Sequence, residues 1–171
     1  LLVPEYQMPS NLDEARAAER FEDVVKVVQN CAIDWKCKVL YKQRVRQRGL
    51  SQYQKLEDEC SILLTVTEDS AKFEVNLTNY IDTGLFLDHR KLRARIASEI
   101  KGKSFLNLFC YTASASVQAA LGGAKSSLSC DMSNTYISWA NRNMSLNNIS
   151  KVAHRLLRVD CVQWLNSDRN V

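Results

Sequence analysis

The second half of the chain alternates between short apolar runs and stretches with helical spacing. Residues 105–109 (FLNLF) are enough for a buried strand and too few for a helix. An Ala-rich stretch at 116–121 favours a helix, which the following Gly-Gly pair should end. Residues 127–130 predict a second short strand, with Asp131 at its carboxyl end. This pattern predicts a parallel βαβ unit.

The alternation continues on both sides of this unit. On the amino-terminal side, an apolar stripe predicts a helix that Asp88 could cap and that Gly102 should close. On the carboxyl-terminal side, Ser133 can cap a further helix, and a third short strand at 155–159 leads into Asp160. The stripes are Leu92, Ile96 and Ile100 in the first helix, and Ile137, Ala140 and Met144 in the second.

The first half of the chain has a different pattern. Residues 1–9 resemble the end of a strand that runs into a linker, and helical spacing then extends from about Ser10 to about Asn30. Two β-rich runs, 61–68 and 72–77, predict a hairpin. We therefore expect an α/β protein: a small α+β region with a β-hairpin over residues 1–75, and a Rossmann-like domain over residues 76–171.

Charge is concentrated between residues 36 and 55, where there are seven cations and no acid. The net charge of the chain is +4, so the remainder sums to 4 − 7 = −3. If residues 36–48 form a strand, the period of two places six cations on one face, where a phosphate backbone would be a natural partner. A solvated charged face is the alternative, and the pattern does not separate RNA from DNA. The six are Lys36, Lys38, Lys42, Arg44, Arg46 and Arg48.

Composition indicates an ordinary globular protein, with 46% hydrophobic and 25% charged residues in 171. No apolar run reaches the roughly 20 residues needed to cross a bilayer, and no signal-peptide pattern begins the chain. Six cysteines include no CxxC pair, and there are two histidines, so we expect no metal site. Reduced thiols in a cytoplasmic protein are the simplest interpretation.

The predicted βαβ unit has the layout of a nucleotide site, because Asp131 follows the first loop by about 20 residues. The loop at 111–115 contains no glycine, which argues against a bound pyrophosphate and hence against a dehydrogenase. A nucleoside cofactor such as S-adenosylmethionine fits better. Asp131 could then bind the ribose and Asp160 the adenine amino group. The alternative is an ordinary βαβ unit with a solvated aspartate.

Three segments carry a family resemblance: NLTNYIDTGLFLDHRKLR, FLNLFCYTASASVQAALGGAKSSLSCDMSNTYISWANRNMSLNN and HRLLRVDCVQWL. They closely resemble the C-terminal half of the bifunctional bacterial 23S rRNA guanine methyltransferases, and the basic RVRQRGLSQYQKL stretch does so too. The resemblance covers about residues 6–165. It implies a class I methyltransferase fold that transfers a methyl group from S-adenosylmethionine to guanine N7, beside an N-terminal half that methylates guanine N2. The motifs separate this family less sharply from its cytosine-modifying relatives.

The resemblance also implies roles for individual residues. The segment at 107–114 corresponds to the first cofactor loop, Asp131 to the ribose acid, and Asp160 with Cys161 to the adenine contact. In the segment at 84–90, Arg90 could pair with the methionine carboxylate and Asp88 with its ammonium group. A helix cap with a surface ion pair is the alternative for these two. The implied cofactor residues are Asp88, Arg90, Asn107, Phe109, Tyr111, Thr112, Ala113, Ser114, Asp131, Met132, Asp160 and Cys161.

Two departures from the family pattern matter. Ala113 stands where relatives have glycine, so it could crowd the cofactor or be held at positive φ. The family's Asp-Pro-Pro motif is also absent, since the prolines are Pro4 and Pro9. We therefore expect a fragment that holds the cofactor half of the site and is inactive alone. Its expected partners are ribosomal RNA, the N-terminal half, and the C-terminal strands of the same protein.

Two other functions fit the same sequence. A non-catalytic module that binds RNA or a partner would show no cofactor affinity. A cytosine-C5 methyltransferase would need a catalytic cysteine in a C-terminal part beyond these residues.

Overall fold

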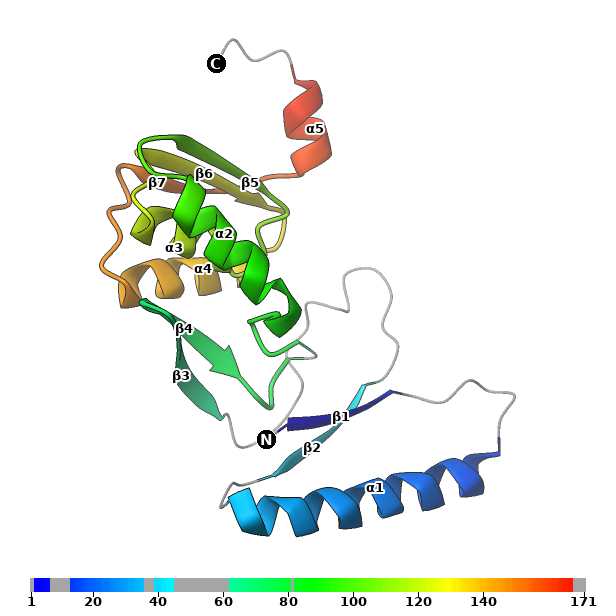
Figure 1. The fold of residues 1–171 in the computed structure, drawn as a ribbon. Helices are drawn as coiled ribbons and strands as arrows, with labels where there is room; N and C mark the ends of the chain where they lie inside the picture. Colours follow the sequence, from blue (N-terminus) through cyan, green and yellow to red (C-terminus); the bar gives the residue numbers. More distant parts are fainter. Residues whose placement is uncertain (1, 7–12, 36–38, 45–61, 81, 168–171) are drawn as a thin grey trace. The chain divides into compact units, whose positions relative to one another are not determined.

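The computed structural model describes residues 2–6, 13–35, 39–44, 62–80 and 82–167 (Figure 1). The chain divides into two units: Leu1–Cys60 with Leu77–Ile81, and Ser61–Asn76 with Asp82–Val171. The hairpin is thus grouped with the second unit by its contacts, whereas the sequence pattern suggested a boundary after residue 75. That boundary stays a prediction.

The first unit contains strand β1 (Leu2–Tyr6), helix α1 (Glu14–Trp35) and strand β2 (Leu40–Arg44). The two strands are parallel, with Leu2 opposite Leu40. The Phe21 ring of α1 meets the Tyr41 ring of β2 edge to face, with centroids 6.1 Å apart. The predicted helix is confirmed and ends five residues later than expected, at Trp35.

The second unit begins with the predicted hairpin, formed by β3 (Leu63–Glu68) and β4 (Ala71–Asn76). A 3-10 turn, η2 (Leu87–His89), leads into helix α2 (Arg90–Glu99). Three strands then pair in parallel in the order β5-β6-β7, which confirms the predicted unit and its third strand. They are β5 (Ser104–Leu108), β6 (Ser126–Asp131) and β7 (His154–Arg158), and they alternate with helices α3 (Ser114–Leu121), α4 (Asn134–Leu146) and α5 (Cys161–Asn166).

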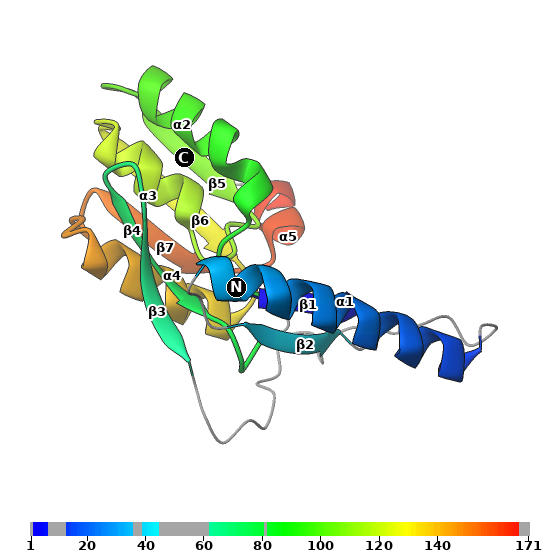
Figure 2. The same cartoon turned by 60° about the horizontal axis from the view of Figure 1, so that its bottom comes forward.

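Helices α3 and α4 pack on the sheet, α2 packs beside α3, and β4 crosses α3 and α4 (Figures 1 and 2). The core between these layers is apolar on the hairpin side, where Phe73 is fully buried, and on α4, where Trp139 is fully buried. Ser133 caps α4 as predicted, because its Oγ accepts a hydrogen bond from the Tyr136 amide at 3.3 Å.

Side chains of α4 pair with backbone groups of β4. The Glu74 amide donates to Asn143 Oδ1 at 2.9 Å, and the Lys72 amide donates to Asn147 Oδ1 at 2.8 Å. The Trp139 indole donates to the Glu74 carbonyl at 3.0 Å. These bonds satisfy backbone groups that a two-stranded hairpin leaves open along its edge, and they fix the hairpin to the helix layer.

Helix α2 differs from its sequence pattern in two ways. Leu92 is 54% exposed, and Arg93 is the buried residue of the helix. The expected cap is also wrong, because α2 begins after His89 and has no side-chain cap, while Asp88 lies in the preceding turn. A stripe of apolar residues alone did not reveal that a charged side chain points inward.

Candidate cofactor site

The loop between β5 and α3 has an unusual backbone conformation. Phe109, Tyr111 and Ala113 have φ angles of 55°, 54° and 57°, in the left-handed region that glycine tolerates best. Ala113 therefore adopts the positive φ that its place in the family pattern suggested. The Ala113 amide donates to the Cys110 carbonyl at 2.8 Å, which closes the turn just before α3.

Asp131 holds this loop against the end of β6. Its side chain is buried, with 8% of the residue exposed. Oδ2 accepts the Tyr111 amide at 2.9 Å, and Oδ1 accepts the Ser133 amide at 2.9 Å. The carboxylate therefore links a strand end, the loop after β5 and the start of α4, and such links compensate for the strained loop backbone.

Asp160 lies at the end of the neighbouring strand and is less enclosed. Its Oδ1 caps α5 by accepting the Val162 and Gln163 amides at 2.9 and 3.0 Å. Within the described residues, Oδ2 has no hydrogen-bond partner. Because β6 and β7 are parallel neighbours, both acids lie at the carboxyl edge of the sheet, where open α/β sheets bind ligands.

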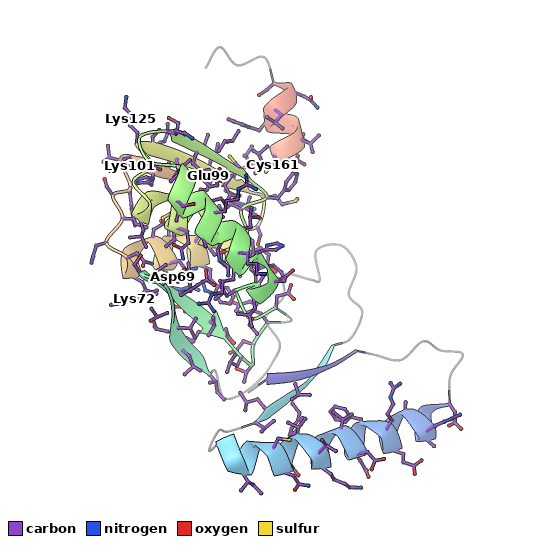
Figure 3. The ribbon with its side chains drawn as sticks, viewed as in Figure 1. Asp69, Lys72, Glu99, Lys101, Lys125 and Cys161 are labelled. Atoms are coloured by element: carbon purple, nitrogen blue, oxygen red, sulfur yellow. The ribbon has the colours of Figure 1, made fainter. Side chains whose placement is uncertain are left out.

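The ends of the sheet are distinguished in Figure 3. Cys161, which follows Asp160, lies at the carboxyl edge, and Lys101 and Lys125 lie at the opposite edge. The Cys161 thiol is buried, accepts the Phe109 amide at 3.3 Å and donates to the Cys130 carbonyl at 3.5 Å. The cofactor loop is thus tied to α5 as well as to β6.

The segment before α2 is anchored over the same loop. Gly84 has φ +94°, and a Cβ there would lie 2.2 Å from Cζ2 of Trp139. Its carbonyl accepts the Thr112 hydroxyl at 2.7 Å. The Phe86 ring lies 5.1 Å from the Tyr111 ring. This approach requires glycine at position 84, which the sequence signalled only as a break in pattern.

Aromatic side chains surround Tyr111. The Tyr136 ring meets it edge to face at 4.5 Å, and Phe86 in turn lies 5.8 Å from the His89 ring. Sequence analysis did not include Phe86, His89 or Tyr136 among the site residues. The only available signal was their nearness in sequence to segments already singled out.

The remaining predicted residues fall into two groups. Asp88, Arg90 and Met132 are exposed, and Asp88 Oδ2 lies 3.7 Å from His89 Nε2. Asn107 instead lies beneath the loop, where its amide donates to Ser116 Oγ of α3 at 2.8 Å. Thr112 is fully buried, and Ser114 begins α3. The structure therefore brings most of these residues to one edge, and it places Asn107 in the helix–sheet interface.

The cysteine beside the loop is unsuited to act as a nucleophile. Burial raises the pKa of the Cys110 thiol well above its usual range, and the nearby Asp131 carboxylate raises it further. A thiol in this state stays protonated at neutral pH, and the protonated form is a weak nucleophile. Cys110 is instead a core residue, with 5% of it exposed.

The basic row predicted from the sequence is only partly described. Lys42 and Arg44 belong to β2, which confirms a strand over that stretch, whereas Lys36, Lys38, Arg46 and Arg48 lie outside the described residues. The row stays a prediction. Among the residues that the structure covers, no group of three His, Cys, Asp or Glu could hold a metal ion, and no helix is long and apolar enough to cross a membrane.

The family described as S-adenosylmethionine-dependent methyltransferase matches residues 1–164. The chain belongs to this family. A relative from Cellvibrio japonicus, named ribosomal RNA large subunit methyltransferase K/L, is 49% identical over 167 residues, which are 97% of this chain and 22% of the relative. The predicted resemblance is therefore confirmed, and the chain spans less than a quarter of the length of that relative.

Solved structures agree on the fold. A Streptococcus mutans protein assigned to the SAM-dependent methyltransferases superposes with a TM-score of 0.71 at 22% identity, over 95% of this chain and 41% of that one. The structure of SMU.776 in complex with SAH gives 0.69 at 23% identity, over 95% and 40%. The expected Rossmann-like fold is confirmed, and family membership confirms the expected enzyme class with S-adenosylmethionine as its cofactor.

Proposed function

We propose that this chain holds the cofactor of a 23S rRNA methyltransferase that modifies guanine N7. The observation that carries the proposal is the pair of strand-end acids, Asp131 and Asp160, beside a loop without glycine. The K/L name of the 49% identical relative supports ribosomal RNA as the substrate. The guanine-N7 position rests on the resemblance of the sequence motifs.

The two acids fit different parts of an adenosine. Oδ2 of Asp160 has a free lone pair within the described structure, and it suits the adenine amino group, which is a donor. Asp131 accepts one backbone amide on each oxygen, and each carboxylate oxygen can accept a second bond, from a ribose hydroxyl. The exposed Met132 next to it offers an apolar, polarizable contact for the adenine face.

The segment at 84–90 fits the amino-acid end of the cofactor. Asp88 and Arg90 are exposed and carry opposite charges, as a zwitterionic group requires. The hydrogen bond from Thr112 and the contact with Trp139 hold the start of the segment in place. We therefore assign the methionine ammonium group to Asp88 and the carboxylate to Arg90.

Methyl transfer to guanine N7 requires mainly that the protein align the methyl group with the base. S-adenosylmethionine supplies an electrophilic methyl group, and guanine N7 is an exposed lone pair, so proximity and orientation are the main requirements. A cytosine-C5 reaction would need a catalytic thiolate, and Cys110 beside the loop does not supply one, because burial raises the pKa of its thiol. The target base must also be unstacked to reach the site.

RNA contact is assigned to the basic row of the first unit, whose cations would meet the phosphates around the target. The chain contains no Asp-Pro-Pro sequence. We therefore assign cofactor binding to these 171 residues, and completion of the methyl-transfer site to other parts of the whole protein, in keeping with the 22% coverage of the relative.

Calorimetric titration of S-adenosylhomocysteine into the chain tests the proposal. The informative variant is Asp160→Asn, because Asn still caps α5 but presents a donor to the adenine amino group. Asp69→Asn is the matched control: it removes the same charge from the hairpin turn, far from Cys161 in Figure 3, and Asn tolerates the positive φ of 54° at that position.

We expect the parent and Asp69→Asn to bind, and Asp160→Asn to bind about tenfold more weakly, the equivalent of about 1.4 kcal/mol. A folded parent that binds no S-adenosylhomocysteine would contradict the proposal and favour a module that only binds RNA or a partner.

A further inference from the structure

A buried ion pair connects the hairpin to α2. Arg93 Nε donates to Glu68 Oε1 at 2.7 Å, and Nη2 donates to Oε2 at 2.6 Å, so the contact is bidentate. Arg93 is 1% exposed and Glu68 is 5% exposed. The Arg93 guanidinium holds the pKa of Glu68 below its ordinary value, so the carboxylate is charged at neutral pH.

The same pair reaches the segment over the cofactor loop. Arg93 Nη1 donates to the Phe86 carbonyl at 2.8 Å, in the middle of the segment at 84–90. On the other side, the Gln118 amide of α3 donates to the Glu68 carbonyl at 3.2 Å. The Arg93 guanidinium therefore fixes Phe86 relative to the hairpin, and the Gln118 side chain fixes the hairpin relative to α3.

Phe86 in turn contacts the cofactor loop. Its ring packs on Tyr111, and the Tyr111 amide is the group that Asp131 accepts. A continuous set of contacts thus runs from Glu68 through Arg93, Phe86 and Tyr111 to Asp131. Asp88 and Arg90 lie two and four residues after Phe86 in the same segment, so a shift of the Phe86 carbonyl would move both charged residues.

Stability alone does not account for this arrangement well. Burying two charges carries a desolvation cost, and well-packed apolar replacements of such pairs are often neutral or stabilising. An apolar side chain could not replace the hydrogen bonds of Arg93. The guanidinium binds a carboxylate and a backbone carbonyl at the same time, in a fixed planar geometry.

We propose that Glu68 and Arg93 form a positioning pair, which sets the segment at 84–90 in the geometry that receives the amino-acid end of the cofactor. This inference rests on the proposed function. It adds that affinity for the methionine portion depends on two residues that touch no ligand and lie outside the cofactor loop.

The test compares two ligands on one variant. The double substitution Glu68→Leu with Arg93→Met removes both charges together, so no unpaired charge is left buried. S-adenosylhomocysteine carries the amino-acid end, and 5′-methylthioadenosine lacks it. Arg142→Met is the control, because it breaks an ion pair between α4 and the hairpin, in which Arg142 Nε lies 2.9 Å from Glu74 Oε1.

We expect the double variant to remain folded, to bind S-adenosylhomocysteine about tenfold more weakly than the parent, and to bind 5′-methylthioadenosine as the parent does. Arg142→Met should bind both ligands like the parent. Unchanged affinity for both ligands, or an equal loss for both, would overturn the positioning role while leaving cofactor binding by the parent intact. A parent that binds neither ligand would contradict the proposed function itself.

Discussion

The two strand-end acids, Asp131 and Asp160, occupy equivalent places on neighbouring strands and are used differently. Asp131 is buried, and both of its oxygens accept backbone amides from segments on either side. Asp160 uses one oxygen to cap α5 and leaves the other without a partner in the described structure. The first acid therefore holds the loop in place and offers a ligand only the remaining lone pairs of its oxygens, whereas the second keeps one whole oxygen for a ligand.

This difference shows that position in the fold does not determine the role of a residue by itself. A carboxylate at the carboxyl edge of a parallel sheet is well placed for a ligand. Whether it serves the ligand or the loop depends on how many nearby amides have no other acceptor, and the loop at 109–114 has its strained backbone stabilised in this way.

The largest expected effect on stability comes from removing the carboxylate of Asp131. Asp131→Ala leaves the Tyr111 and Ser133 amides without their acceptor, so we expect the free energy of unfolding to fall by about 3 kcal/mol. Urea unfolding measures it. Asp160→Asn, which keeps its capping oxygen, should change stability by less than about 0.5 kcal/mol. Equal losses in the two variants would remove the distinction between the acids.

A smaller effect on stability is expected at Ala113, where the loop holds a residue other than glycine at a φ of 57°. Ala113 is fully buried, so its methyl group is not exposed to a ligand. Replacing it with glycine should therefore act by relieving backbone strain and not by making room for the cofactor. We expect Ala113→Gly to raise the unfolding free energy by about 0.5 kcal/mol, the strain of about 1–2 kcal/mol being partly offset by chain entropy.

Thermal denaturation measures the change at Ala113, and Ala120→Gly inside α3 is the control, which should lose about 1 kcal/mol. A large gain in S-adenosylhomocysteine affinity by Ala113→Gly, without a gain in stability, would instead indicate crowding.

The smallest effect on stability concerns the contact between His154 of β7 and Ser127 of β6. His154 Nδ1 lies 3.0 Å from Ser127 Oγ across β6 and β7, and burial lowers the pKa of the imidazole. Below an unfolded-state pKa of about 6.5, the unfolded chain therefore binds more protons, so stability from this residue is present above that pH and is lost as the pH falls.

We expect the parent to lose less than about 0.5 kcal/mol more than His154→Asn between about pH 7 and about pH 5, as measured by urea unfolding at each pH. Identical pH profiles would show that His154 is protonated in the folded protein as easily as in the unfolded one.

Much of this organisation follows from local sequence. The strands Ser104–Leu108 and Ser126–Asp131 lie where short strand-like runs alternate with helical stretches, and Ser133 caps α4 as its residue type predicts. These features depend on neighbours within a few residues.

Contacts between distant segments were not predictable in this way. Arg93 is not part of the apolar stripe that the sequence placed on α2, and its partner Glu68 is 25 residues away. The pairing of Asn143 with the Glu74 backbone joins residues 69 positions apart. Such bonds depend on how layers pack, and a single sequence contains no periodic signal for them.

The most direct test of the account is whether Asp160 distinguishes adenine from hypoxanthine. S-inosylhomocysteine carries a carbonyl acceptor where S-adenosylhomocysteine carries the amino donor. We predict that the parent prefers the adenosyl ligand about tenfold or more and that Asp160→Asn, which presents an amide donor, reverses or abolishes this preference. Calorimetric titration of both ligands into both proteins gives the four affinities. The same preference in the parent and in Asp160→Asn would contradict the claim that Asp160 is the acid that binds the base.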